Sequence, residues 1–286
     1  MALPVTMYRW DDPGAPQLDL NNGSMLQLLK KCLVDGYGEK LGAGWVVNEI
    51  SADSNNMIFS PASQNWYYLL YDDARNSYLT NKAAMIGAID GWTDIETPVS
   101  SLHYEDWTGR ISENKGANQY LDKRGATWCL IATSEWFYLL QTGVASNTPA
   151  AAFIGRLDCA GFDMAYTLIA YNPYWLDNDS IQLLRPSAPY FTRKVKVPIL
   201  LDLNTMTAGI LNSISPSAPL EKALNPQALT RKVWLDLVFK NESGQLVGRL
   251  PNTESAYIYN NSIDIPENYS VIDGYLFFSS LRWKLS

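Results

Sequence analysis

From about residue 45 to residue 190, hydrophobic positions come in short runs separated by clusters of Asn, Ser, Gly and Pro. The runs are rich in aromatic, β-branched and leucine residues, which is typical of strands. The pattern predicts a mainly β, antiparallel, sandwich-like fold with strands at 57–60, 66–71, 83–90, 127–133, 136–141, 151–157 and 165–171.

Two segments, 172–180 and 185–190, are rich in Pro, Asn, Asp and Ser and interrupt this pattern. Strand-like runs resume after them, for example in KVKVPILLDL, RKVWLDLVFK and YSVIDGYLFF. Domain boundaries commonly fall in such polar, proline-containing stretches. We therefore expect an N-terminal β-rich domain over 1–190 and a C-terminal β domain over 191–286.

One segment near the N-terminus has helical periodicity. Between 24 and 35 the apolar residues fall on one helical face, at Met25, Leu28, Leu29, Cys32 and Leu33. Ser24 is a suitable N-cap, and Gln27 follows at the spacing of a capping box. Gly36 or Gly38 can end the helix in a left-handed conformation. The sequence predicts one short helix here.

A hairpin-like pattern occurs twice, at 66–90 and at 136–158. Both copies read W-[YF]-Y-L-L, then a polar loop, then A-A-x-I-G-x-[IL]-D. Gly87 and Gly155 stand mid-strand, which indicates a bulge or a close approach, and Trp66 and Trp136 are expected over the facing strands nearby. The repeat represents either two sheet halves from an old duplication or two similar carbohydrate- or peptide-binding platforms.

Composition narrows the possible partners. Charged residues make up 18% of the 286 residues, and the net charge is −7. The neutral polar surface fits a protein packed against other subunits, and equally an ordinary β protein. The one concentrated basic stretch, 193–196, is too short to indicate nucleic-acid binding. No apolar window is long enough to cross a membrane, and residues 1–10 do not form a signal peptide.

Few residues in the sequence suggest a catalytic, metal-binding or cofactor-binding site. Cys32, Cys129 and Cys159 lie far apart and suggest reduced thiols, without spacing for zinc. His103 is the single histidine, and no nucleophile elbow or phosphate-binding loop occurs. Adjacent carboxylate pairs on strands face opposite sides, so we expect no catalytic, cofactor-binding or metal-binding residues. The ten Trp and 17 Tyr suit either sugar platforms or protein interfaces.

The opening segment carries a more specific pattern, YRWDDPGAPQL followed by CLVDGYGEK and GW. It resembles the opening of a group of tailed-bacteriophage virion structural proteins. The matching residues are Tyr8, Arg9, Asp12, Gly14, Ala15, Pro16, Leu18, Cys32, Leu33, Val34, Gly36, Tyr37, Gly38, Lys40, Gly44 and Trp45. The stretch 128–139 and GRLP at 248–251 are also similar, although Asn252 departs from the pattern.

The resemblance implies a non-enzymatic structural component of a phage virion, in the tail or baseplate or decorating the head. Its partners would be other virion proteins, in a homo-oligomer or multi-copy assembly formed in the host bacterial cytoplasm, without cofactor, nucleic acid or membrane. The alternatives are a receptor- or glycan-binding module and a carboxylate-dependent glycan hydrolase. We expect the hairpin loops to be contact surfaces, with candidate residues Asp72, Asp73, Arg75, Asn76, Tyr78, Gln141, Thr142 and Asn147.

Overall fold

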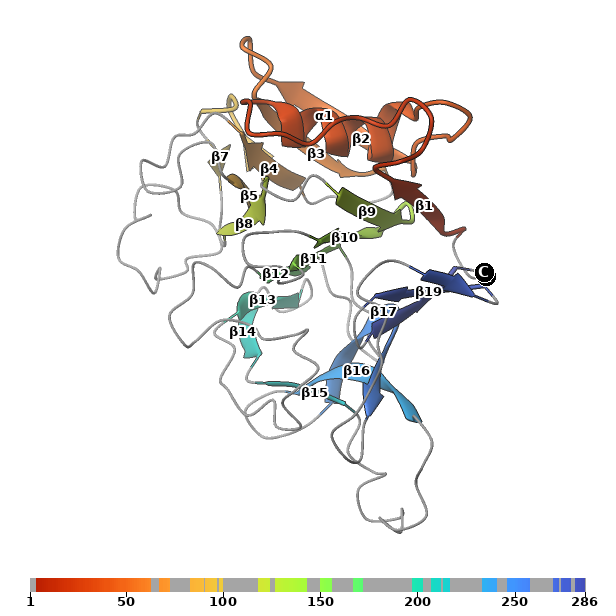
Figure 1. Cartoon of the computed structure of the whole chain (residues 1–286). Coiled ribbons are helices and arrows are strands. Elements are labelled where there is room, and N and C mark those ends of the chain that lie inside the picture. The colour runs from red at the N-terminus through yellow and green to blue at the C-terminus, as the bar shows by residue number, and fades with distance from the viewer. Residues whose placement is uncertain are drawn as a thin grey trace.

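The chain folds into antiparallel sheets with one short helical segment near the N-terminus (Figure 1). All strand pairs found are antiparallel, which confirms the predicted fold class. The structure is a computed structural model that describes residues 4–62, 67–72, 83–89, 91–96, 98–99, 118–123, 127–142, 150–155, 167–171, 197–202, 207–211, 213–216, 233–240, 246–257, 270–272, 274–278 and 281–285.

The first sheet has five strands in the order β2-β3-β4-β5-β8. Their bounds are Trp45–Ile50, Asn56–Pro61, Tyr67–Tyr71, Ala83–Ile89 and Asn118–Asp122. A two-stranded ribbon, β6 (Gly91–Trp92) with β7 (Pro98–Val99), comes between β5 and β8 along the chain.

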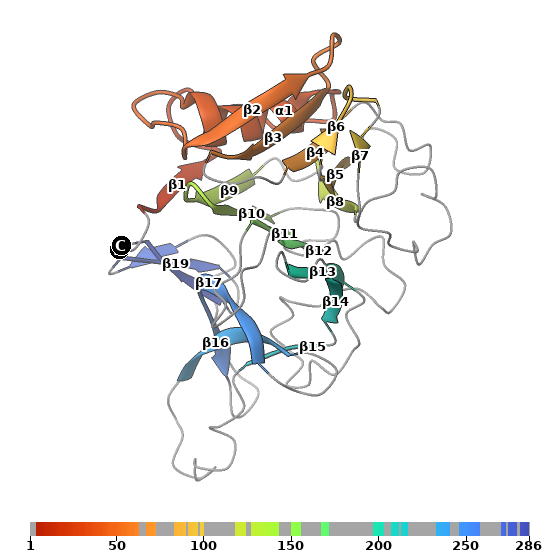
Figure 2. The same cartoon turned by 180° about the vertical axis from the view of Figure 1, so that it is seen from behind.

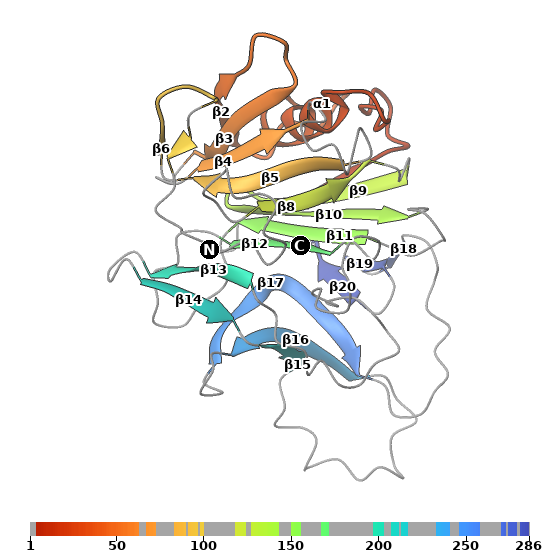
Figure 3. The ribbon, with the colours of Figure 1, turned by 90° about the vertical axis from the view of Figure 1, so that its left-hand side faces the viewer.

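The second sheet also has five strands, in the order β1-β9-β10-β11-β12. Their bounds are Thr6–Arg9, Thr127–Ala132, Trp136–Thr142, Ala150–Gly155 and Thr167–Tyr171. β1 therefore joins this sheet at its edge, although the whole first sheet separates it from β9 in sequence. Figure 3 shows the strands of the two sheets one above another.

The repeated sequence forms an antiparallel hairpin in each sheet, β4 with β5 and β10 with β11. In the second copy Gly155 lies opposite Trp136, at a φ of +133°, where an added Cβ would overlap the Trp136 backbone. In the first copy Gly87 lies opposite Leu69, and Trp66 is outside the described residues. The predicted close approach is confirmed at Gly155, and the two copies differ in register.

The helical segment consists of α1 (Ser24–Lys30) continued by a π-helix, η1 (Lys31–Asp35). The predicted bounds are confirmed, but the predicted cap is wrong. Gly23 is the N-cap, at a φ of 79°, and the Ser24 hydroxyl instead donates to the carbonyl of Asp19 at 2.7 Å. Gly36 ends the segment at a φ of 81°, and its N–H bonds to the carbonyl of Lys31.

One hydrophobic core contains residues of the helical segment and of both sheets. The Trp45 ring of β2 lies 5.4 Å from the Phe137 ring of β10, which connects the two sheets directly. Figures 1 and 2, seen from opposite sides, place α1 against one face of β2 and β3. A smaller cluster covers the other face of the first sheet, with Ile58, Leu69, Tyr71, Ile89 and Ile95.

The C-terminal region forms a ribbon and a six-stranded sheet. The ribbon pairs β13 (Val197–Asp202) with β14 (Thr207–Leu211). The sheet has the order β15-β16-β17-β20-β19-β18, with bounds Ser213–Pro216, Val233–Lys240, Leu246–Tyr257, Leu281–Lys284, Tyr275–Phe278 and Ser270–Ile272.

Residues of this C-terminal region also enter the main core. Leu276 and Trp283 belong to it, and the Trp283 ring lies 5.6 Å from the ring of Tyr138 on β10. The Tyr138 hydroxyl donates to the carbonyl of Pro251 at 2.8 Å. The expected boundary at residue 190 is outside the described residues, so the division into two domains stays a prediction.

Candidate functional site

β1 is an edge strand, so half of its backbone groups point away from β9. The N–H of Trp10, just after β1, donates to the Trp128 carbonyl at 3.1 Å. Backbone groups alternate in direction along an antiparallel strand. Those of Met7 and Arg9 therefore point outward, where an unprotected edge could pair with another strand.

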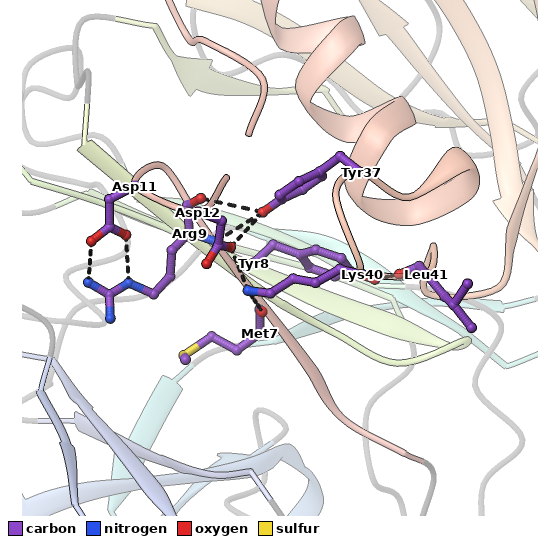
Figure 4. Close-up of polar contacts among 8 residues, drawn as sticks. All are labelled: Met7, Tyr8, Arg9, Asp11, Asp12, Tyr37, Lys40 and Leu41. Atoms are coloured by element: carbon purple, nitrogen blue, oxygen red, sulfur yellow. Dashed lines mark hydrogen bonds and ion pairs between the residues drawn. The ribbon is translucent and has the colours of Figure 1, made fainter. Parts of the chain in front are cut away.

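Three side chains occupy this outward edge, and we call Asp12, Tyr37 and Lys40 the edge cluster (Figure 4). The Lys40 Nζ donates to the Met7 carbonyl at 2.8 Å. The Arg9 N–H donates to Asp12 Oδ2 at 2.7 Å and to the Tyr37 hydroxyl at 3.2 Å. The edge cluster therefore satisfies backbone groups that a further strand would otherwise use.

The Asp12 carboxylate is the centre of this cluster. Its Oδ2 also accepts a hydrogen bond from the Tyr37 hydroxyl at 2.8 Å and forms an ion pair with the Lys40 ammonium. Partial burial acts to raise the pKa of Asp12, but the hydrogen bonds from Lys40, the Arg9 N–H and Tyr37 outweigh it and hold the pKa below its ordinary value. Asp12 is thus an ionised structural acceptor.

Tyr8 connects β1 to the loop that follows η1. Its hydroxyl donates to the Leu41 carbonyl at 2.6 Å, and its ring lies 5.8 Å from the Tyr37 ring. Burial raises the pKa of Tyr8 to about 12, so the phenol stays protonated as a donor at neutral pH.

Glycines allow the two loops to approach each other. Gly38 has a φ of +56°, and an added Cβ would lie 2.6 Å from the Pro13 carbonyl oxygen. At Gly36, with a φ of +81°, an added Cβ would overlap the Lys40 carbonyl oxygen. Residues other than glycine are disfavoured at both positions, because the backbone has a positive φ and because a Cβ atom would clash with a carbonyl oxygen.

A second polar cluster is fully buried at the start of α1. Asp72, which follows β4, accepts from the Met25 N–H at 2.7 Å and from the Leu26 N–H at 3.4 Å. It also forms an ion pair with Lys123, which follows β8, and Lys123 donates to the Asn21 carbonyl at 2.6 Å. Burial raises the pKa of Asp72. Asp72 therefore caps α1 from a distant segment.

The candidate interface residues do not all lie on the surface. Asp72 is 1% exposed and Gln141 is 2% exposed, so the structure corrects the expectation for both. Asp72 is buried because it caps α1 and pairs with Lys123, and Gln141 is buried as part of β10. Thr142 is the last residue of β10. The remaining candidates, Asp73, Arg75, Asn76, Tyr78 and Asn147, are outside the described residues.

The acids of both clusters bond to backbone N–H groups and to lysines. Across the described ranges, no group of three or more His, Cys, Asp or Glu residues could hold a metal ion. Cys32 and Cys129 are free, buried thiols whose pKa burial raises. Cys159 and His103 are outside the described residues.

Among the residues that the structure describes, no helix is long and apolar enough to cross a membrane. No family model matches the chain, and a search of the curated proteins gives no significant match.

Proposed function

We propose that the chain is a non-enzymatic structural component of a tailed-bacteriophage virion, in the tail or baseplate or on the head surface. It acts through contacts with other virion proteins, in several copies, after assembly in the host bacterial cytoplasm. The proposal rests on the resemblance of the opening segment and on what the resembling residues do in the fold.

One observation carries the proposal: residues of the resembling pattern that are far apart in sequence converge on the edge of β1. Tyr8 and Asp12 meet Tyr37 and Lys40 there, and each contact holds backbone or a loop in place. Residues engaged in such contacts support the local fold, as expected of a scaffold. A reactive centre would instead present unpaired acids or bases to a substrate.

The glycan-binding alternative receives less support. Trp45, Trp128, Trp136 and Trp283 are each at most 5% exposed, so they are core residues. Among the tryptophan side chains that the structure describes, Trp10 alone is exposed. A sugar platform needs accessible aromatic faces.

Mass spectrometry of purified particles tests the proposal. Particles of the phage that encodes the chain should contain it at a constant copy number through density-gradient purification, together with the known capsid and tail proteins as internal standards. Loss of the chain during purification, while those standards remain, contradicts the proposal.

A further inference from the structure

β1 presents a short, regular strand at the outer edge of the second sheet. It pairs with β9 in unbroken register, and the bond from the Trp10 N–H to the Trp128 carbonyl fixes which residues face β9. Because the direction alternates along the strand, the backbone groups of Tyr8 face β9 and those of Met7 and Arg9 face outward. An added antiparallel strand would bond to these outward groups.

The outward groups of β1 are complementary to those of a second copy of β1. In an antiparallel pair of two such strands centred on Tyr8, Met7 of one copy lies opposite Arg9 of the other. Residues in this position can exchange both backbone hydrogen bonds, N–H to carbonyl in each direction. The pairing has the two-fold symmetry of an isologous dimer, so a second β1 is a strand that fits this edge.

The edge cluster occupies backbone groups that this pairing would use. The Lys40 ammonium bonds to the Met7 carbonyl. The Arg9 N–H bonds to the Asp12 carboxylate and to the Tyr37 hydroxyl. In the pair of strands, the Arg9 N–H of one copy would instead need the Met7 carbonyl of the other. The cluster therefore satisfies, within one chain, a donor and an acceptor of the reciprocal pair.

The loop that carries Tyr37 and Lys40 is bonded to the β1 segment through side chains. Backbone hydrogen bonds close the turn between Tyr37 and Lys40, and others join the following residues to η1. The contacts with the β1 segment run from Tyr37 and Lys40 to Asp12, and from Tyr8 to Leu41. The side chains of Lys40 and Asp12 are 32% and 17% exposed, so the covered edge lies close to the surface.

β2, at the edge of the first sheet, is irregular where β1 is regular. It lies outermost in that sheet, and its pairing with β3 shifts register between Val47 and Glu49 (Figure 3). A bulge of this kind interrupts regular pairing and bends an edge strand, which discourages strand addition. Since β1 has no such shift against β9, the protection of its edge depends on the edge cluster.

We propose that the edge cluster is an autoinhibitory contact that keeps β1 from pairing with β1 of a second copy. While the cluster is closed, the second sheet does not extend through β1, and the chain contacts its partners through other surfaces. The proposal concerns one edge of the fold and does not rest on the proposed virion role.

Sedimentation velocity of the purified full chain tests the proposal. The double variant Asp12→Ala/Lys40→Met removes both members of the ion pair, so neither charge is left uncompensated. Asp35→Ala/Lys30→Met is the matched control, because it removes an ion pair of the same residue types between η1 and α1. If far-UV circular dichroism shows an intact fold, the double variant should self-associate at least about tenfold more tightly than the wild type and the control.

A proline on β1 shows whether this association uses the edge. The Met7 N–H points away from β9, so Met7→Pro removes an outward donor without removing a bond to β9. Added to the double variant, it should return self-association to the wild-type level. A folded double variant that associates no more tightly than the control overturns the proposal, and so does association that Met7→Pro leaves unchanged.

If the double variant does not fold, Lys40→Met alone uncovers the Met7 carbonyl. It should increase self-association in a way that Met7→Pro reverses, and no increase overturns the proposal.

Disulfide formation tests the register of the two strands. Copies of the associating variant that carry Met7→Cys are mixed with copies that carry Arg9→Cys, in the presence of oxidised glutathione. Opposite residues of a hydrogen-bonded antiparallel pair have Cα atoms about 5.5 Å apart, which suits a disulfide. We expect a cross-link between positions 7 and 9, mapped by mass spectrometry. Cross-links only between identical positions contradict the proposed pairing.

Discussion

At the scale of single residues, the polar side chains of the opening segment form hydrogen bonds that hold backbone groups in place. The sequence pattern identified Tyr8, Asp12, Tyr37 and Lys40, since all four belong to the resembling residues. It did not predict that they meet, because Asp12 and Lys40 are 28 residues apart in sequence and lie on separate loops. Nothing in the sequence predicted that Lys123 is buried and paired with Asp72, since one lysine in a polar stretch is usually exposed.

The edge cluster gives a direct stability prediction. Asp12→Asn keeps the size of the side chain but removes the charge that pairs with Lys40, so we expect a loss of about 1–3 kcal/mol in the free energy of unfolding. Urea denaturation at pH 7 measures it. Asp11→Asn is the matched control, because Asp11 is exposed and pairs with the partly exposed side chain of Arg9. An equal, small effect of both changes would show that the cluster does not stabilise β1.

Tyr8 makes stability depend on alkaline pH. Its pKa is raised from 10.0 to about 12 in the folded state, so between these values the unfolded chain binds fewer protons than the folded chain. Stability therefore falls as the pH rises through this range. Tyr8→Phe should lower stability at pH 8 by removing the bond to Leu41, and should make the decline above pH 10 shallower. An unchanged decline would contradict the assigned role of Tyr8.

At the scale of elements, the hydrophobic pattern was a good guide to strands and a poor guide to their pairing. The strand predictions near 127–133 and 136–141 correspond to β9 (Thr127–Ala132) and β10 (Trp136–Thr142). The motif could not reveal that its two copies differ in register, because pairing depends on loops and facing sheets. Nor could local sequence show that Asp72, not Ser24, caps α1.

The buried pair at the start of α1 should be sensitive to removal of either partner. Asp72→Asn or Lys123→Met leaves one buried charge uncompensated, and we expect each to cost about 3–5 kcal/mol. The double variant should be less destabilised than the sum of the two single variants. Chemical denaturation of the four proteins measures this cycle. Additive losses would mean that Asp72 and Lys123 do not stabilise each other.

At the scale of the whole molecule, other parts of the chain pack on both faces of the second sheet. The first sheet and helical segment cover one face, and Trp283 and Pro251 contact Tyr138 on the other. The Pro- and Asn-rich segments suggested a domain boundary. Contacts between regions distant in sequence could not be predicted from the hydrophobic pattern, because they depend on which face each strand presents.

These contacts predict cooperative unfolding. Because Leu276 and Trp283 share a core with both sheets, near-UV and far-UV circular dichroism should follow one coincident thermal transition. Trp283→Ala should lower the midpoint of that transition without splitting it. Two separate transitions in the wild-type chain would instead support independent N-terminal and C-terminal domains.

The central claim is that the chain is a structural part of a phage particle. A cryo-electron microscopy map of the intact particle tests it most directly. We predict density for repeated copies of the two five-stranded sheets with α1 against them, in the tail, at the baseplate or on the head surface. A map in which every protein density is assigned to other chains, and none to this fold, would contradict the claim.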